Sequence, residues 1–231
     1  NLFFLPFTKS FFTNFDAVIN LPQKYKNKRL HVGLPNNKKL NIDINKKNDF
    51  LKKLIFIYGG SQGSQNLINN FLLLIKTIDD RDLNKLKFII QCPKKQNEIL
   101  EKNLKNLKVD FQIKPYFEDI DNILVETDIA ITRAGAGTIN DLVRYKIPSI
   151  IFPLPNSIYN HQYYNAKFLL DKKACIVINE NNFNLNDFSK GFNRLINEKK
   201  YFENMKESIS NIVLPDTNEL ILKTLLHKDN E

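Results

Sequence analysis

The sequence predicts an α/β fold built on a doubly wound parallel sheet. Two observations lead to this class. From residue 54 onward, short apolar runs alternate with longer amphipathic segments, and the runs are rich in β-branched and aromatic residues with no polar face. Strands that are apolar on both sides suit a parallel sheet covered by helices on both faces. Each strand–helix–strand step implies a right-handed crossover, which predicts a sheet wound in both directions.

Residues 1–35 hold two strand candidates, 11–21 and 29–34, which cannot form a domain alone. Residues 36–50 are polar and basic without periodicity, which indicates a linker. We therefore expect 1–35 to be the tail of a preceding domain and 51–231 to be a second domain that includes the C-terminal helices. Because the chain begins at Asn1 and its single Met is Met205, we expect it to be the C-terminal part of a longer protein.

The second domain is expected to alternate strands and helices before it ends in helices alone. Its strand candidates are residues 54–58, 87–92, 109–114, 128–132, 149–153 and 174–178. Its helix candidates are residues 65–78, 94–103, 119–126, 138–145, 160–171, 185–198, 201–212 and 216–228. The amphipathic spacing of these segments is the basis of the helix assignment.

The composition is that of a globular chain, with 42% hydrophobic and 26% charged residues in 231. The formal net charge of +9 suits an anionic partner, or it reflects a composition rich in Lys, Asn and Ile, and the scattered basic residues favour the second explanation. Cys92 and Cys175 lie in apolar runs without metal-ligand spacing and are expected to be reduced core thiols. The longest apolar run is far shorter than a membrane span.

Glycine is scarce, and its positions are informative. Three of the seven glycines lie in GGSQG at 59–63, and two lie in AGAG at 134–137. Both loops follow a predicted strand and open a predicted helix, where free N–H groups attract anions. The first loop lacks the Lys of a P-loop and the spacing of a dinucleotide fingerprint. It is either a tight turn with Ser61 as N-cap or a phosphate-binding loop.

The second loop carries more polar chemistry. Arg133 ends a strand candidate, Thr138 can cap the following helix, and Asp141 lies one turn later on the same face. Asp141 either counters the helix dipole or binds the hydroxyls of a ribose. His161 and Gln162 begin another helix at the end of a strand candidate, and His161 is either a capping or surface group or a catalytic one.

Five segments in register carry a family resemblance: GGSQGSQNLIN, PYFEDI, DIAITRAGAGTINDL, IPSIIFPLP and HQYYNA. In order and spacing they resemble the C-terminal half of the MurG family, from about residue 28 to the end. These enzymes have two Rossmann-like domains, the GT-B fold of glycosyltransferase family 28. They transfer N-acetylglucosamine from UDP-N-acetylglucosamine (UDP-GlcNAc) to the MurNAc 4-OH of lipid I, which gives lipid II for peptidoglycan. The resemblance implies that this chain is the donor domain and that residues 1–35 are the tail of the acceptor-binding domain.

The resemblance also implies a role for individual residues. Ser61 would bind a phosphate, the Phe117 backbone would bind the uracil edge with Tyr116 as a ring cap, and Asp141 would hold the ribose. The sugar and diphosphate would meet Ala136, Gly137 and Thr138, with Gln162 on the sugar hydroxyls and Asn165 supporting that loop. The full set of implied substrate-binding residues is Ser61, Gln62, Gly63, Phe117, Ala136, Gly137, Thr138, Asp141, Gln162 and Asn165.

Three positions depart from the family pattern. Asp141 replaces a Glu, Gly137 replaces a larger apolar residue, and Asn37 replaces an Arg that contacts the nucleotide. The first two are expected to be tolerated. The third is expected to weaken affinity for the donor.

The resemblance implies an inverting transferase with no metal and no cofactor, whose catalytic base lies in the other domain, so that this chain is inactive alone. The implied partners are UDP-GlcNAc, lipid I through that domain, and the anionic cytoplasmic face of the bacterial inner membrane, but no nucleic acid. Two alternatives remain open at this point. One is a donor-binding subunit that needs a separate acceptor-domain protein, and the other is a nucleotide-binding regulator without transfer activity.

Overall fold

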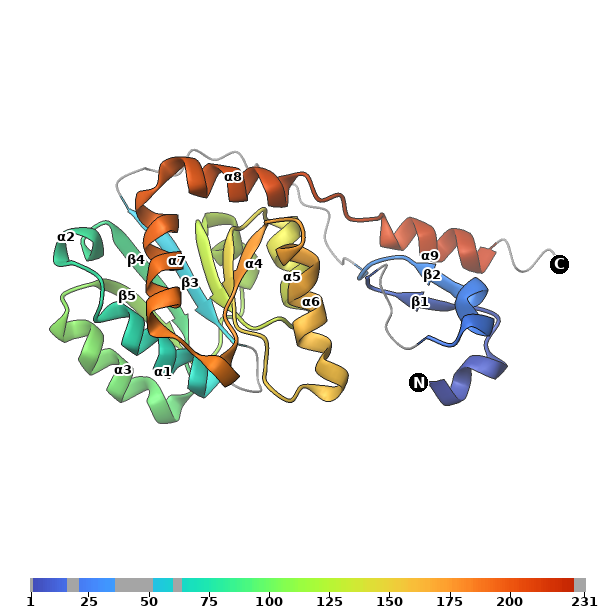
Figure 1. Ribbon diagram of the computed structural model, residues 1–231, viewed down its shortest axis with the longest axis horizontal. Coiled ribbons are helices and arrows are strands. Elements are labelled where there is room, and N and C mark those ends of the chain that lie inside the picture. Colours follow the sequence, from blue (N-terminus) through green and yellow to red (C-terminus); the bar gives the residue numbers. More distant parts are fainter. Residues whose placement is uncertain (1, 16–20, 36–51, 60–63, 227–231) are drawn as a thin grey trace. The chain divides into compact units, whose positions relative to one another are not determined.

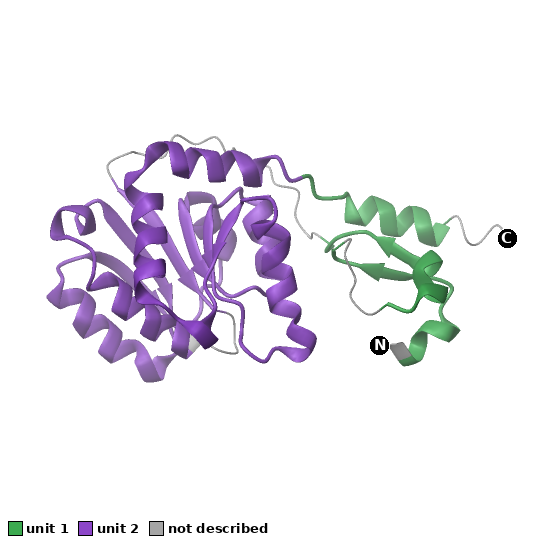
Figure 2. Ribbon diagram, in the orientation of Figure 1, with its two compact units in different colours: residues 1–41, 213–231 green, residues 42–212 purple. Residues whose placement is uncertain are grey.

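The computed structural model describes residues 2–15, 21–35, 52–59 and 64–226. The chain divides into two compact units, shown in different colours in Figure 2. Unit 1 comprises residues 1–41 and 213–231, and unit 2 comprises residues 42–212. The predicted linker at 36–50 lies outside the described residues, so the proposed boundary remains a prediction.

Unit 1 is small and combines both ends of the chain. Its elements are η1 (Leu2–Phe7), β1 (Phe11–Thr13), η2 (Gln23–Lys28), β2 (Arg29–His31) and α9 (Thr217–Leu226). The two strands pair in parallel and are shorter than the sequence predicted. The Thr217 hydroxyl donates to the main-chain oxygen of Val32, which ties α9 to the segment after β2. Helix α9 therefore belongs with unit 1, although the sequence analysis assigned every C-terminal helix to the second domain.

Unit 2 contains the predicted sheet. Its strands are β3 (Lys53–Tyr58), β4 (Leu86–Gln91), β5 (Asp110–Lys114), β6 (Ile129–Thr132), β7 (Ser149–Ile151) and β8 (Cys175–Val177). All pair in parallel in the order β5-β4-β3-β6-β7-β8 (Figure 1). The first strand of the sheet, β3, lies at its centre. The chain then continues outward through β4 to the edge strand β5, returns to β6 on the other side of β3, and continues through β7 to the opposite edge strand β8. The α/β, doubly wound prediction is confirmed, and the direction of winding reverses between β3 and β6.

The helices of unit 2 are α1 (Ser64–Ile75), α2 (Asp80–Leu83), α3 (Lys94–Asn106), α4 (Ile120–Glu126), α5 (Ala136–Arg144), α6 (His161–Leu170), α7 (Leu185–Asn197) and α8 (Lys199–Ser210). Short 3-10 turns, η3 (Ile158–Asn160) and η4 (Glu180–Asn182), precede α6 and α7. The predicted helices are present with end shifts of a few residues. The short helix α2 was not predicted.

The main core lies between the sheet and one layer of helices. Ile55 and Ile57 of β3 are fully buried there among apolar side chains of α1, α3 and α7. Those three helices run in front of the sheet in Figure 1. The alternate β3 residues Phe56 and Tyr58 point to the opposite face, as strand geometry requires. Strand β3 is thus covered on both faces, which explains its continuous apolar sequence.

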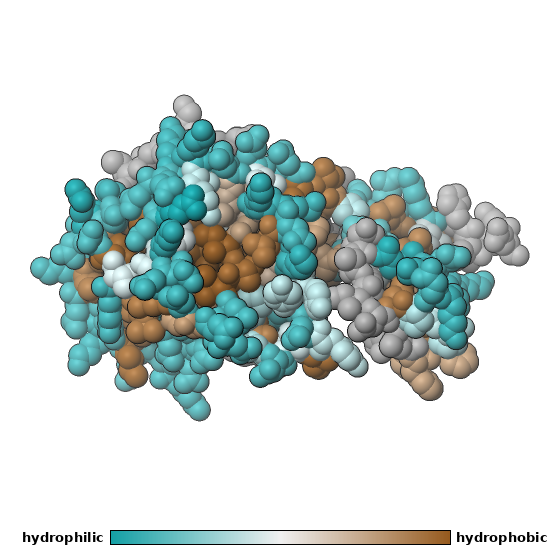
Figure 3. Space-filling model, viewed as in Figure 1, coloured by the Kyte–Doolittle hydropathy of each residue, from teal (hydrophilic) through white to brown (hydrophobic). Residues whose placement is uncertain are grey.

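Both cysteines are buried and free, as the sequence predicted. Burial raises the pKa of Cys92 to about 11 and that of Cys175 to about 12, so both thiols are un-ionised at neutral pH. No helix within the described ranges is long and apolar enough to cross a bilayer. Figure 3 shows the hydropathy of one face of the molecule, where apolar side chains lie among a larger number of hydrophilic ones.

Candidate functional site

The candidate site lies where the direction of winding reverses. Strands β3 and β6 are neighbours, with Tyr58 paired to Thr132 at their carboxyl ends. The Thr132 hydroxyl donates to the main-chain oxygen of Tyr58 at 2.7 Å, which fastens the two strand ends together. In open α/β sheets ligands bind outside the carboxyl ends of the strands at this switch point.

The two glycine loops follow these strand ends. The first starts at Gly59, which is buried, and continues into 60–63. The predicted phosphate ligands Ser61, Gln62 and Gly63 lie outside the described residues, so neither reading of that loop is tested. The second loop is described in full and leads from β6 into α5.

Helix α5 begins at Ala136 and has Gly135 as its N-cap, with no side-chain cap. Thr138 is therefore the third residue of the helix, and the prediction that it caps the helix is wrong. The first helical hydrogen bond runs from the Ile139 N–H to the Gly135 oxygen. The N–H groups before it point out of the helix end, where they suit an anion. A methyl group added at Gly137 would have no atom within 4 Å, so open space lies beside this helix end.

Asp141 occupies the second turn of α5, six residues into the helix. A helix dipole acts mainly within the first turn, so this position weakens the dipole-compensating reading. Burial raises the pKa of Asp141 to about 6, the charge of Asp121 adds to the shift, and Arg144 opposes it. Among the described residues no hydrogen bond to the Asp141 carboxylate is formed, so the group is held half-buried and available to a ligand hydroxyl.

An aromatic stack links the first strand end to the predicted uracil contact. The rings of Phe56 and Tyr58 stack with centroids 4.3 Å apart, and Phe117 meets Phe56 edge-on at 6.0 Å. Phe117 is buried, whereas the neighbouring Tyr116 is 68% exposed, and its predicted role as a ring cap is not tested. The stack therefore holds the β5–α4 loop against β3, beside the switch point.

The hydroxyl of Tyr58 is buried beside this site without a hydrogen bond of normal geometry to any described residue. Burial raises the pKa of Tyr58 well above its ordinary value, the charge of Asp141 adds to this, and the nearby Thr132 hydroxyl opposes it. Since the one proton of Thr132 goes to the Tyr58 carbonyl, Thr132 cannot also donate to the phenol. Sequence reasoning did not identify Tyr58, which reads as one more apolar strand residue.

Gln162 and Asn165, at the start of α6, hold the second loop in place. The Gln162 Oε1 accepts the N–H groups of Ala134 at 3.2 Å and Leu154 at 3.0 Å. The Asn165 Nδ2 donates to the Ala134 oxygen at 2.9 Å. The two side chains therefore fix both main-chain groups of Ala134. The predicted sugar contact of Gln162 would fall to its Nε2, since Oε1 is committed to the backbone.

A buried ion pair fixes the same edge of the sheet. The Arg133 Nη1 lies 2.8 Å from the Glu180 Oε1, and the two side chains are 3% and 6% exposed. The same nitrogen donates to the Phe152 oxygen at 3.2 Å. This pair joins the ends of β6 and β7 to the turn after β8. Sequence analysis singled out Arg133 only as a residue at a strand end and missed Glu180, because no local pattern connects them.

His161 has only a local role in the described geometry. Its Nδ1 lies 2.9 Å from the Ile158 oxygen, and the side chain is exposed. The N-cap of α6 is Asn160, so His161 does not occupy the capping position, and a catalytic role for it is not tested. Among the described residues no three His, Cys, Asp or Glu side chains are placed to hold a metal ion.

Comparison with known proteins places this arrangement in a family. Residues 54–218 match the glycosyltransferase family 28 C-terminal domain. A relative from Rickettsia bellii is 30% identical over 214 residues, covering 90% of this chain and 60% of its own. A relative from Campylobacter jejuni subsp. doylei is 30% identical over 226 residues, covering 98% and 60%. Both are named UDP-N-acetylglucosamine--N-acetylmuramyl-(pentapeptide) pyrophosphoryl-undecaprenol N-acetylglucosamine transferase.

Solved structures agree on the fold. Acinetobacter baumannii MurG superimposes with a TM-score of 0.76 at 20% identity, over 95% of this chain and 61% of its own. The glycotransferase of kitacinnamycin superimposes with a TM-score of 0.62 at 12% identity, over 86% of this chain and 49% of its own. The chain spans about 60% of the length of the Rickettsia bellii and Campylobacter jejuni relatives. By its family match and its fold, the chain belongs to glycosyltransferase family 28, through the C-terminal domain of that family.

Proposed function

We propose that this chain is the donor-binding half of an inverting glycosyltransferase that moves N-acetylglucosamine from UDP-GlcNAc to the MurNAc 4-OH of lipid I. The single observation that carries the proposal is the arrangement at the switch point. There the uncapped start of α5, the half-buried Asp141 carboxyl and the amide of Gln162 follow two neighbouring strands. The names of the relatives support the choice of sugar and acceptor.

Each part of the donor has a matching group. The diphosphate suits the start of α5, whose N–H groups and dipole attract negative charge. The ribose hydroxyls suit Asp141, which has no other hydrogen bond among the described residues. The base suits the β5–α4 loop, where Phe117 is held by the aromatic stack. The Nε2 of Gln162 suits a sugar hydroxyl. The predicted phosphate contacts of Ser61, Gln62 and Gly63 remain part of this proposal.

The chemistry divides between this chain and another domain. The acceptor hydroxyl attacks the anomeric carbon, the bond from that carbon to the UDP oxygen breaks with inversion, and a base takes the hydroxyl proton. This chain would stabilise the negative charge that develops on UDP, by means of the helix N–H groups. The base is assigned to the acceptor-binding domain of the family. We therefore propose that this chain binds the donor weakly and does not turn it over alone. The proposal includes action at the cytoplasmic face of the bacterial inner membrane, where a lipid-linked acceptor lies.

Isothermal titration calorimetry tests the donor assignment. The chain is titrated with UDP-GlcNAc, UDP, GDP-mannose and ADP-glucose at constant ionic strength. We expect heat with the two uridine nucleotides and weaker binding of the others. Asp141→Ala should weaken UDP binding by about 1–3 kcal/mol, the usual effect of losing a buried hydrogen bond to a charged group. Asp171→Ala, in an exposed pair on α6, is the matched control. Absence of heat with UDP-GlcNAc, or tighter binding of a GDP- or ADP-sugar, would contradict the proposal.

A further inference from the structure

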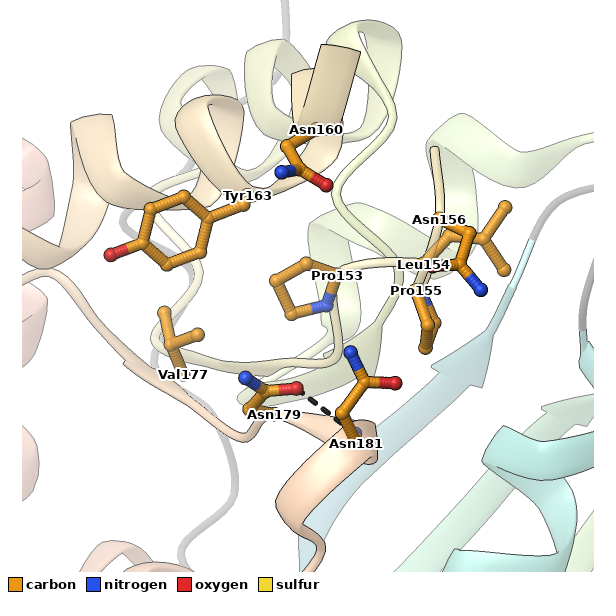
Figure 4. A pocket seen from close by; sticks show the side chains of 9 residues that line it. All are labelled: Pro153, Leu154, Pro155, Asn156, Asn160, Tyr163, Val177, Asn179 and Asn181. Carbon is orange, nitrogen blue, oxygen red and sulfur yellow. Dashed lines mark hydrogen bonds between the residues drawn. The ribbon is translucent and has the colours of Figure 1, made fainter. Parts of the chain in front are cut away.

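A separate hollow lies at the carboxyl ends of β7 and β8, farther along the sheet edge than the switch point. It is partly open to solvent and has a volume of about 190 Å³. One wall comes from the β7–α6 loop and the first turn of α6, and the other from the end of β8 and η4 (Figure 4). Its lining residues are Pro153, Leu154, Pro155, Asn156, Asn160, Tyr163, Val177, Asn179 and Asn181. The set contains no residue of the β6–α5 loop, so the hollow is distinct from the space beside Gly137.

The lining is neutral and amphipathic. It contains four asparagines and one tyrosine but no charged residue. A carboxamide both donates and accepts hydrogen bonds, as a hydroxyl does, whereas a phosphate site would require Lys, Arg or free N–H groups. Figure 4 shows the Tyr163 ring, Pro153 and Val177 bordering one side of the space, with the amides of Asn160, Asn179 and Asn181 around it. A ligand with an apolar face and a rim of hydroxyls would satisfy both kinds of surface.

The amide groups that border the hollow are mostly free to bind a ligand. The Asn179 Oδ1 accepts the Asn181 N–H at 3.0 Å, which fixes the Asn179 side chain and leaves its Nδ2. Within the described ranges, the side chains of Asn156, Asn160 and Asn181 make no hydrogen bond to the protein. Their full hydrogen-bonding capacity is therefore turned to solvent, where a ligand can use it.

The loop that forms one wall has an unusual backbone. Asn156, Tyr159 and Asn160 adopt left-handed conformations, with φ of 59°, 54° and 53°. Left-handed backbone is unfavourable for a bulky side chain such as Tyr159, and that side chain is 88% exposed, so its own burial does not offset the cost. The loop is fixed from within by the Gln162 Oε1, which accepts the Leu154 N–H. Further bonds within the loop run from the Ser157 N–H to the Leu154 oxygen and from the Asn160 N–H to the Ser157 oxygen, and they support the shape of this wall.

From these observations we propose that the hollow binds one neutral pyranose ring of a glycan, separate from the sugar of the nucleotide donor. The ring would place its C–H face on Tyr163 and its hydroxyls on the carboxamides of Asn160, Asn179 and Asn181. The volume corresponds to about six water molecules at ~30 Å³ each, which suits a single sugar unit and not a nucleotide. The inference does not require the proposed donor, but it gives the domain a second sugar contact beside the first.

Saturation-transfer NMR on the full 231-residue chain tests the proposal. The probes are methyl β-N-acetylglucosaminide, methyl β-glucoside and glucose 6-phosphate, each with and without saturating UDP-GlcNAc. We expect the two neutral sugars to bind, to persist with UDP-GlcNAc present, and to exceed the charged sugar. Absence of signal from both neutral sugars, or stronger binding of glucose 6-phosphate, would overturn the proposal.

Variants connect any signal to the hollow. Tyr163→Ala should weaken neutral-sugar binding about 3- to 10-fold, the usual range for a lost aromatic contact, whereas Tyr163→Phe should retain it. Asn181→Ala should weaken binding, and Asn182→Ala, on the same turn but outside the lining, should not. Calorimetry with UDP-GlcNAc on the same variants should be unchanged. If the lining variants weaken UDP-GlcNAc instead, or if UDP-GlcNAc displaces the free sugar, the hollow belongs to the donor and the proposal fails. Failure of UDP-GlcNAc to bind wild-type chain would contradict the proposed function alone.

Discussion

Replacing one member of the buried Arg133–Glu180 pair should destabilise unit 2 strongly. Glu180→Gln retains the size of the side chain and removes its charge. The Arg133 guanidinium would then be 3% exposed without the carboxylate that now lies 2.8 Å away. Removing one partner from a buried pair usually costs about 3–5 kcal/mol, because the remaining charge stays desolvated.

Two details place the expected loss near the lower end of that range. The oxygen of the new amide can still accept from Arg133 Nη1, and the same nitrogen keeps its bond to the Phe152 oxygen. We therefore expect Glu180→Gln to lower the free energy of unfolding by about 3 kcal/mol, and Arg133→Met, which removes every donor, by about 3–5 kcal/mol. The double variant should lose less than the sum, since neither charge is left alone.

Urea unfolding followed by circular dichroism at pH 7 measures these differences. The control is Lys105→Met, which breaks a 2.7 Å pair with Glu101 between side chains that are 66% and 43% exposed. Such a surface pair should contribute less than about 0.5 kcal/mol. A loss below about 1 kcal/mol for Glu180→Gln, or additive losses in the double variant, would refute the reasoning.

Further predictions concern three side chains of the site, Asp141, Gln162 and Tyr58. Asp141→Asn should raise the free energy of unfolding at pH 7.5 by at most about 3 kcal/mol. The reason is that the wild-type pKa near 6 makes the folded wild type lose stability as pH rises between about 4 and 6. Urea titrations should show the difference in stability between variant and wild type closing below pH 4. By the same titration, wild-type affinity for UDP-GlcNAc, whose diphosphate has no group that ionises near pH 6, should increase as pH rises through 6. Calorimetry at pH 5 and 7.5 that gave equal values would contradict the ribose contact. Gln162→Glu keeps an acceptor for the Ala134 and Leu154 N–H groups, so its free energy of unfolding should be within about 1 kcal/mol of wild type, yet it should bind UDP-GlcNAc more weakly. Gln162→Ala should lose about 1–3 kcal/mol of stability. A urea titration in which Gln162→Glu was the less stable of the two would contradict a role of Gln162 in holding the loop. Tyr58→Phe removes a buried hydroxyl that has no hydrogen bond in the described structure, and thermal unfolding should show unchanged or slightly higher stability, with any clear decrease pointing to a missed partner.

The sheet was predictable because each strand is apolar on both faces. Runs such as residues 54–58 leave no polar face for solvent, so burial between two helix layers was the consistent solution. The four residues of α2 were not predictable, because so short a helix has no periodicity to detect. The N-cap of α5 was predicted at Thr138 but lies three residues earlier, at Gly135, which adopts the N-cap conformation without a side chain.

The site was predictable only in part, since its contacts cross the sheet. Glycine scarcity identified the second loop, and the family resemblance identified Gln162 and Asn165. That both amides bind one residue, Ala134, depends on β6 and β7 being neighbours, which no local pattern encodes. Glu180 and Tyr58 were missed for the same reason. An acidic residue after a strand, or an aromatic residue at the end of one, has no recognisable role until the fold shows which residues surround it.

The bond from Thr217 to Val32 has a consequence for the order of folding. It joins residues 185 positions apart in sequence, and all of unit 2 lies between them. Unit 2 is one continuous segment and can fold as soon as it leaves the ribosome, whereas α9 can join β1 and β2 only after the whole of unit 2 has been synthesised. Until then β1 and β2 lack this helix, whereas every described strand and helix of unit 2 has already been synthesised.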